Sequence, residues 1–237
     1  MTRPSKRTPE QIRKVEIIPH VSKHAEGSCL IKFGDTHVLC TASVEERVPP
    51  FLRNKGTGWV TAEYSMLARS THTRNSRDPM KPNGRSIEIQ RLIGRALRSA
   101  VDTSLLGERQ IIIDCDVIQA DGGTRCAAIT GGYVALAIAI NKLTNQRLVR
   151  SNPLKGKVCA ISCGIFNGEV VADLDYAEDS KCEVDTNFVI NEKFNLIEIQ
   201  GTAEVGDMSF EHVSQMYELA KNAAKEIFEI QKKAIQS

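Results

Sequence analysis

The sequence lacks the features that mark membrane and secreted proteins. Its 237 residues show no run approaching the roughly 20 apolar residues that span a bilayer. The polar, basic amino-terminal segment carries no apolar signal-peptide core. A hydrophobic fraction of 41% and a charged fraction of 25% are near globular averages, which excludes disordered and fibrous classes. We therefore expect a cytoplasmic protein.

Patterns typical of metal, redox or covalent catalytic sites are also missing. No Cys-x-x-Cys pair occurs, and no serine–histidine–acid order, Walker loop or pair of metal-binding histidines stands out. The seven cysteines lie scattered at positions 29, 40, 115, 126, 159, 163 and 182. This distribution favours reduced, mostly buried thiols and gives no indication of a covalent nucleophile.

Net charge is small, but positive charge is concentrated in one segment. The whole chain carries +2, whereas residues 69–98 contain eight Lys or Arg against Asp78 and Glu88, a local balance of +6. The eight basic positions are 69, 74, 77, 81, 85, 91, 95 and 98. The segment therefore predicts a local surface for an anionic partner such as nucleic acid.

The order of β-rich and helical segments predicts an α/β protein with mixed sheets. The expected strands are 15–18, 28–33, 37–44, 59–64, 110–117, 158–166, 170–174, 187–190 and 196–200. Helical spacing begins at Ser86, which is placed to cap its helix. An almost wholly apolar run at 126–143 suits a buried helix, and Ser209 opens an amphipathic helix that continues to the carboxyl terminus. Two sheet-plus-helix halves in a single domain, residues 1–237, fit this order best.

A glycine pair lies between a predicted strand and a predicted helix, in Asp121-Gly-Gly-Thr-Arg125. Glycine lets the backbone approach a ligand closely, and the first amides of a helix favour phosphate. Arg125 adds a fork of donors shaped to phosphate oxygens, and Arg85 could bring a second guanidinium to the same anion. The alternative is an ordinary turn at a helix start, with Asp121 as its cap and Arg85 solvated.

Two further groups of charged residues suggest functional roles. The stretch from Arg69 to Arg77 mixes cations with hydroxyl and amide donors and contains no acid, which favours a phosphodiester backbone over a solvated loop. It lacks interleaved aromatic residues, so base stacking is not indicated there. Acidic residues gather at Asp173, Asp175, Glu178, Asp179, Glu183 and Asp185. These could hold Mg²⁺ or assist proton transfer, although a solvated acidic face is the simpler interpretation, and Asp114 and Asp116 could join them or orient arginines.

Taken together, these motifs resemble the ribonuclease PH family of bacterial phosphorolytic exoribonucleases along essentially the whole chain. The matching segments include Lys23-His-Ala-Glu-Gly-Ser28, Phe33-Gly-Asp-Thr36, Gly58-Trp-Val-Thr-Ala-Glu-Tyr64, Thr71-His-Thr-Arg-Asn75, Glu88-Ile-Gln-Arg-Leu-Ile93, Gln119-Ala-Asp-Gly-Gly-Thr-Arg125 and Ile199-Gln-Gly-Thr-Ala-Glu204. Many linked motifs in one order are far more specific than a single glycine turn.

The resemblance implies a fold of two related βαβα-like halves and a homo-hexamer built as a trimer of dimers. It also implies an activity: the removal of nucleotides from the 3′ ends of transfer RNA precursors and other RNA, with inorganic phosphate as co-substrate and nucleoside 5′-diphosphates as products. The reverse reaction would add nucleotides. The alternatives are a non-catalytic RNA-binding ring subunit, and a hydrolytic exonuclease, which the arginine-rich site disfavours.

The resemblance also assigns residues. Phosphate binding falls on Arg85, Gly123, Thr124 and Arg125, and RNA binding falls on Arg69, Arg74 and Arg77. The family's metal-binding and catalytic aspartates match Asp179 and Asp185, so a divalent metal, Mg²⁺, is expected there, with Arg125 as a further catalytic residue. The chain departs from the usual pattern at Asn83-Gly-Arg-Ser86, where relatives usually have Gly-Gly-Arg-Thr.

Overall fold

A computed structural model of the chain describes residues 3–76 and 84–237. In the first half, a five-stranded sheet has the order β1-β2-β3-β5-β4. Its strands are Val15–Pro19 (β1), Gly27–Phe33 (β2), Thr36–Glu45 (β3), Trp59–Met66 (β4) and Gln110–Gln119 (β5). β4 pairs with β5 in parallel, and the other neighbours are antiparallel. Helix α1 (Gly84–Ser99) connects β4 to β5 and packs against β4.

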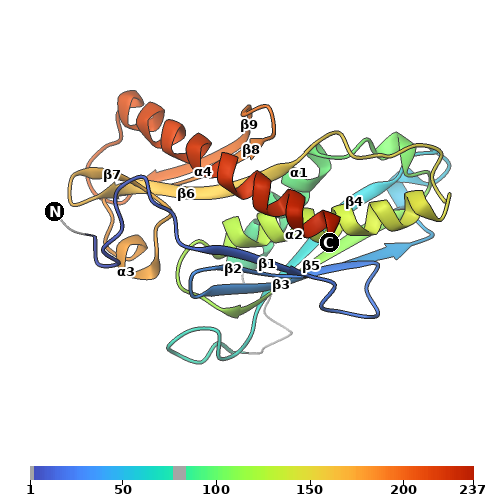
Figure 1. Cartoon of the computed structure of the whole chain (residues 1–237), viewed down its shortest axis with the longest axis horizontal. Coiled ribbons are helices and arrows are strands. Elements are labelled where there is room, and N and C mark those ends of the chain that lie inside the picture. The colour runs from blue at the N-terminus through green and yellow to red at the C-terminus, as the bar shows by residue number, and fades with distance from the viewer. Residues whose placement is uncertain (1–2, 77–83) are drawn as a thin grey trace.

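The second half has a four-stranded antiparallel sheet of order β7-β6-β8-β9. Its strands are Val158–Phe166 (β6), Glu169–Ala172 (β7), Val184–Asn191 (β8) and Leu196–Ala203 (β9). The short helix α3 (Tyr176–Asp179) lies between β7 and β8, and α4 (Phe210–Gln236) ends the chain. Figure 1 shows α4, in red, running along the second sheet, and it contacts β6, β7 and β1.

Helix α2 (Thr124–Asn145) joins the halves into one core. It packs against β2, β3 and β5 of the first sheet and against β6 of the second (Figure 1). Because both of its sides are covered, it has no polar face, and every residue of Cys126–Ile140 is buried. By length and composition α2 could cross a membrane, but 89% of its most apolar window is buried in the chain. It is therefore the core helix that the apolar run at 126–143 predicts.

The predicted fold class and element order are confirmed, with corrections at element ends. Helix α1 begins at Gly84, so Ser86 lies in its first turn and the predicted cap at Ser86 is wrong. Strand β7 ends at Ala172, not at 174, because Asp173 has a left-handed backbone (φ 54°) that interrupts an extended strand. The prediction for the cysteines is confirmed, since all seven are buried and free.

Candidate active site

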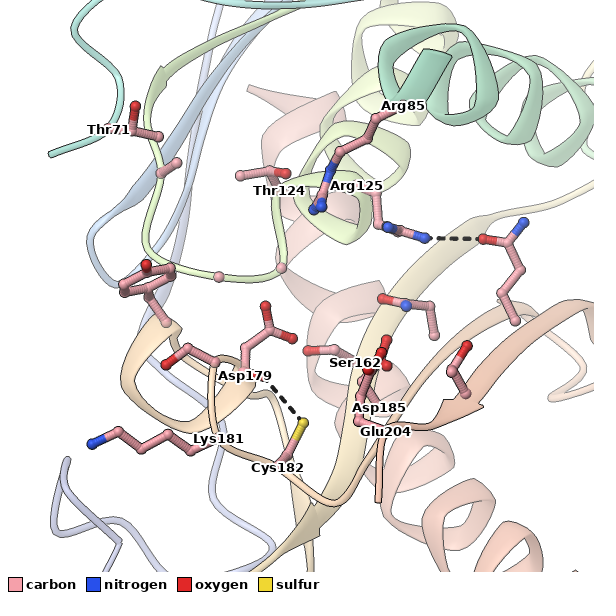
Figure 2. Close-up of a pocket in the computed structure, with 18 of the residues that line it drawn as sticks. Thr71, Arg85, Thr124, Arg125, Ser162, Asp179, Lys181, Cys182, Asp185 and Glu204 are labelled. Atoms are coloured by element: carbon pink, nitrogen blue, oxygen red, sulfur yellow. Dashed lines mark hydrogen bonds between the residues drawn. The ribbon is translucent and has the colours of Figure 1, made fainter. Parts of the chain in front are cut away.

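A cleft with a volume of about 1210 Å³ lies where the two halves meet. The first half lines it with the loop at 71–75, the start of α1 and the turn at 122–125. The second half lines it with the end of α3 and with residues of β8 and β9. Figure 2 shows side chains from both halves facing one another across this space. A site here can therefore combine groups that are far apart in the sequence.

The glycine turn forms one wall of the cleft. Gly122 and Gly123 both have left-handed backbones, with φ of 75° and 66°, which glycine adopts without a steric penalty. Gly123 is the N-cap residue of α2, so the first amides of that helix start at the cleft without intrahelical partners. Such amides, at the positive end of the helix dipole, bind phosphate readily.

Two arginines begin two helices at the same cleft. Arg85 is in the first turn of α1 and Arg125 in the first turn of α2, and Figure 2 shows both among the cleft side chains. The Arg125 Nη1 donates a hydrogen bond to Gln200 Oε1 at 3.1 Å and lies 3.7 Å from Glu88 Oε1. The two arginines, with Gly123 and Thr124, are the four residues predicted to bind phosphate, and all four line the same cleft.

A hydrogen bond to the first sheet fixes the position of Thr124. Its hydroxyl lies 2.8 Å from the hydroxyl of Tyr64, a buried residue of β4. Burial raises the pKa of Tyr64, and the hydrogen bond with Thr124 opposes that shift. Tyr64 therefore remains protonated at neutral pH and joins the first sheet to the start of α2.

The two predicted catalytic carboxylates lie on the opposite wall. Asp179 ends α3 and Asp185 lies on β8, and both line the cleft (Figure 2). Partial burial and the negative charge of Asp185 raise the pKa of Asp179, while Arg85 and Arg125 oppose the shift. The pKa of Asp185 is raised mainly by partial burial. Two carboxylates on one wall of the cleft thus face two guanidinium groups on the other.

Three other acidic residues of this segment, Asp173, Asp175 and Glu178, have a structural role. Asp173 and Glu178 are fully buried, and each binds an arginine of the amino-terminal segment. Arg3 bonds to both carboxylate oxygens of Glu178, at 2.6 and 2.7 Å. Arg7 reaches Asp173, Asp175 and Glu178 at 3.1–3.2 Å. These acids are therefore neither a solvated face nor part of the cleft.

Arg13 connects this buried network to the glycine turn. Its Nε and Nη2 donate to the two carboxylate oxygens of Asp173 at 2.9 and 2.7 Å, and its backbone N–H donates to the same carboxylate at 2.7 Å. Its Nη1 donates to the carbonyl oxygen of Asp121. The Arg13 Nη2 also lies so near Gly123 that a Cβ there would be 3.0 Å away. Arg13 thus supports the turn from behind the cleft.

Sequence reasoning missed this arginine network and helix α3. The amino-terminal segment reads only as polar and basic, and nothing local pairs it with residues more than 150 positions away. Helix α3 did leave a signal, because Asp175 and Glu178 form a capping box, with Asp175 accepting from the Glu178 N–H and Glu178 accepting from the Asp175 N–H. A Ser, Thr, Asp or Asn followed three residues later by Glu is the usual mark of a helix start.

Two of the three predicted RNA-binding arginines, Arg69 and Arg74, lie beside the cleft rather than in its lining. Arg69 and Arg74 are exposed, while their neighbours Thr71, His72, Thr73 and Asn75 line the cleft. Arg77 lies outside the described residues. Asp114 and Asp116 do not line the cleft, so they do not join Asp179 and Asp185 there.

Family models and named relatives match nearly the whole chain. The model of the 3′ exoribonuclease family, domain 1, matches residues 11–140, and that of domain 2 matches residues 156–223. Proteins named ribonuclease PH from three strains of Cereibacter sphaeroides are each 56% identical over 235 residues, which covers 98% of this chain and 99% of theirs.

Solved structures share the fold at low sequence identity. A crystal structure of rice (Oryza sativa) Rrp46 has a TM-score of 0.82 at 21% identity and covers 99% of this chain and 100% of that one. A structure described as the Archaeoglobus fulgidus exosome with RNA bound to the active site has a TM-score of 0.80 at 21% identity, covering 96% of this chain and 92% of that one. At this identity the likeness concerns the fold alone.

The Arg13–Asp173 contact predicts a pH-dependent loss of stability in Asp173→Asn. Burial alone would raise the pKa of Asp173, but Arg13 and Arg7 outweigh it and lower the pKa below the usual aspartate value. The ion pair therefore stabilises the fold above about pH 4, and this contribution is lost as the pH falls through the lowered pKa. At pH 7 we expect Asp173→Asn to lose about 3 kcal/mol of unfolding free energy, measured by urea denaturation.

Asparagine suits this test because it tolerates the left-handed backbone of residue 173. The control is Asp207→Asn, at an exposed position, which should change stability by less than about 0.5 kcal/mol. A difference between wild type and Asp173→Asn that did not shrink below pH 4 would contradict the ion-pair interpretation.

Proposed function

The chain belongs to the ribonuclease PH family and is a phosphate-dependent 3′ exoribonuclease of the nucleotidyltransferase class, and we propose how its residues carry out the reaction and on which RNA. The proposed main substrate is the 3′ end of transfer RNA precursors. The observation that carries the proposal is the cleft itself, which places a glycine turn and two arginines opposite two carboxylates.

In the proposed reaction, inorganic phosphate is held by Arg85, Arg125 and the amides around Gly123 and Thr124. An oxygen of this phosphate attacks the phosphorus of the last internucleotide bond and forms a new P–O bond. The bond from that phosphorus to the 3′-oxygen of the preceding nucleotide breaks. The attacking phosphate loses a proton and the departing 3′-oxygen gains one, so a nucleoside 5′-diphosphate and a shortened RNA result. Phosphoryl transfer of this kind depends mainly on positioning and charge stabilisation.

The carboxylates of Asp179 and Asp185 fit a Mg²⁺ ion. Both line the cleft, and the charge of Asp185 raises the pKa of Asp179, so a cation between them would relieve repulsion. Among the described residues no group of three or more metal-binding side chains occurs. Mg²⁺ is commonly held by one or two carboxylates plus substrate phosphates, so two are sufficient. Bound there, the ion would neutralise charge that develops on the phosphoryl oxygens.

The exposed loop beside the cleft would hold the RNA backbone. Arg69 and Arg74 carry charge without an acidic neighbour in 69–77, and we assign Arg77 the same role from the sequence alone. Such contacts go to phosphates and are therefore independent of base sequence. This suits an enzyme that removes successive nucleotides of any kind.

Assembly and location are also part of the proposal. We place the enzyme in the cytoplasm as a homo-hexamer, a trimer of dimers, in which residues 1–237 act as a single domain. One hydrophobic core that includes residues of both sheets supports the single domain. Phe210, with an exposed fraction of 90%, is an apolar side chain outside the cleft lining that a subunit interface would cover.

The products of digestion test the proposed function directly. A transfer RNA precursor with a short 3′ tail is incubated with and without phosphate, and the released nucleotides are identified by chromatography. We expect nucleoside diphosphates that appear only with phosphate. Monophosphates without phosphate would instead show hydrolysis, and RNA binding without products would show a silent ring subunit.

Removal of either cleft arginine should weaken phosphate use. Losing one charge-assisted hydrogen-bonding group costs about 1.5–3 kcal/mol, or roughly 10- to 150-fold. We expect Arg85→Gln and Arg125→Gln to lower kcat/KM for phosphate by that factor in steady-state assays. The control is Arg91→Gln, an exposed arginine of α1 outside the cleft, which should match wild type. Equal losses in all three variants would refute a specific phosphate site.

Chelation should reversibly stop the reaction if Asp179 and Asp185 hold Mg²⁺. We expect EDTA to abolish phosphorolysis and added Mg²⁺ to restore it. Because each variant removes a carboxylate ligand, Asp179→Asn and Asp185→Asn should raise the Mg²⁺ concentration for half-maximal activity about tenfold or more. Glu169→Gln, an exposed carboxylate of β7 outside the cleft, should leave that concentration unchanged. Full activity in EDTA would rule out the metal.

A further inference from the structure

One aromatic side chain at the cleft has no part in the reaction described so far. Tyr176, the first residue of α3, lines the cleft with 52% of its surface exposed. The ring of His72, from the loop on the other side, lies 6.0 Å from it between centroids, with 53° between the ring planes. His72 is also exposed and also lines the cleft. Two exposed rings from different halves of the chain thus meet at this cleft.

The backbone around Tyr176 is held in a defined place. The capping box of Asp175 and Glu178 fixes the turn of α3, and Arg3 and Arg7 bind the buried Glu178. On the other side, Gly122 packs so tightly that a Cβ there would lie 2.8 Å from the Tyr176 nitrogen. The ring therefore projects from a rigid support, although it is itself exposed.

This support puts the ring close to the reacting groups. Tyr176 precedes Asp179 by three residues, so their side chains lie on the same side of one helical turn. Its backbone also touches the glycine turn that we assign to phosphate. A group that contacts the ring therefore lies in the same cleft as the glycine turn and the two carboxylates.

The size of the cleft indicates what contacts the ring. Its volume of about 1210 Å³ exceeds the roughly 300–1,000 Å³ of typical small-molecule binding pockets. Phosphate therefore fills a small part of it. In the proposed function, the 3′ end of the RNA occupies the rest of the cleft. Its terminal base is a flat, apolar surface near the reacting phosphate.

We propose that Tyr176, flanked by His72, is a stacking platform for the base of the 3′-terminal nucleotide. This inference rests on the proposed function, because it takes RNA as the occupant of the cleft. Every base has a π-face, so stacking binds each of them. The platform would hold the terminal nucleotide without selecting its identity, which serves an enzyme that removes any nucleotide.

Fluorescence tests the platform without turnover. An RNA ending in 2-aminopurine ribonucleotide is titrated with protein in the absence of phosphate, since stacking quenches this base. We expect strong quenching with wild type and with Tyr176→Phe, and clearly weaker quenching with Tyr176→Ala at saturating protein. Equal quenching by wild type and Tyr176→Ala would overturn the proposal.

Kinetics with a modified RNA separate stacking from a structural effect. Two RNAs are compared that differ only in the presence of the terminal base, one ending in an abasic ribose. We expect Tyr176→Ala to raise KM about tenfold for the RNA with the base and to leave KM unchanged for the abasic RNA. KM for phosphate should also stay unchanged. An equal rise for both RNAs would overturn the proposal in favour of a structural role.

Two controls keep this test apart from the test of the enzyme class. Phe51→Ala removes another exposed ring, outside the cleft and packed on Trp59, and should leave both readouts at wild-type values. Failure of wild type to release nucleoside diphosphates would contradict the proposed function, whereas the fluorescence titration would still decide whether Tyr176 stacks on the base.

Discussion

The buried ion pair between Arg13 and Asp173 is the contact on which the site depends. It ties the start of the chain to the residue that follows β7 and, through the Asp121 carbonyl, to the glycine turn of the first half. A buried ion pair contributes little net stability compared with an apolar replacement, because both charges must leave water. Here the ion pair fixes the geometry of the turn. One orientation of the Arg13 guanidinium donates hydrogen bonds both to the Asp173 carboxylate and to the carbonyl oxygen of the turn.

The same contact explains how the acidic segment is used. Asp173, Asp175 and Glu178 are neutralised by the amino-terminal arginines. Asp179 and Asp185 are left to the cleft, facing Arg85 and Arg125. Carboxylates that look alike in the sequence are therefore divided by the fold into a structural set and a pair that lines the cleft.

Local patterns predicted most of the fold and part of the site. Helix α2 and the strands follow from apolar periodicity and turn residues, and the glycine turn with Arg125 follows from its place between a strand and a helix. The start of α1 was misplaced. Helix α3 was missed because four residues leave little periodicity, and the partners of Arg13 were missed because no local rule relates residues 160 positions apart.

The division of the cleft between two halves constrains its chemistry. The groups that we propose to bind phosphate come from helix starts of the first half, and the cleft carboxylates come from α3 and β8 of the second. Phosphoryl transfer tolerates little displacement between the attacking and stabilising groups, since about 1 Å can cost roughly 100-fold in rate. The core helix α2, buried between both sheets, and the Arg13 network behind the turn are the two elements that hold this distance. Their burial is therefore as much a requirement of the reaction as of the fold.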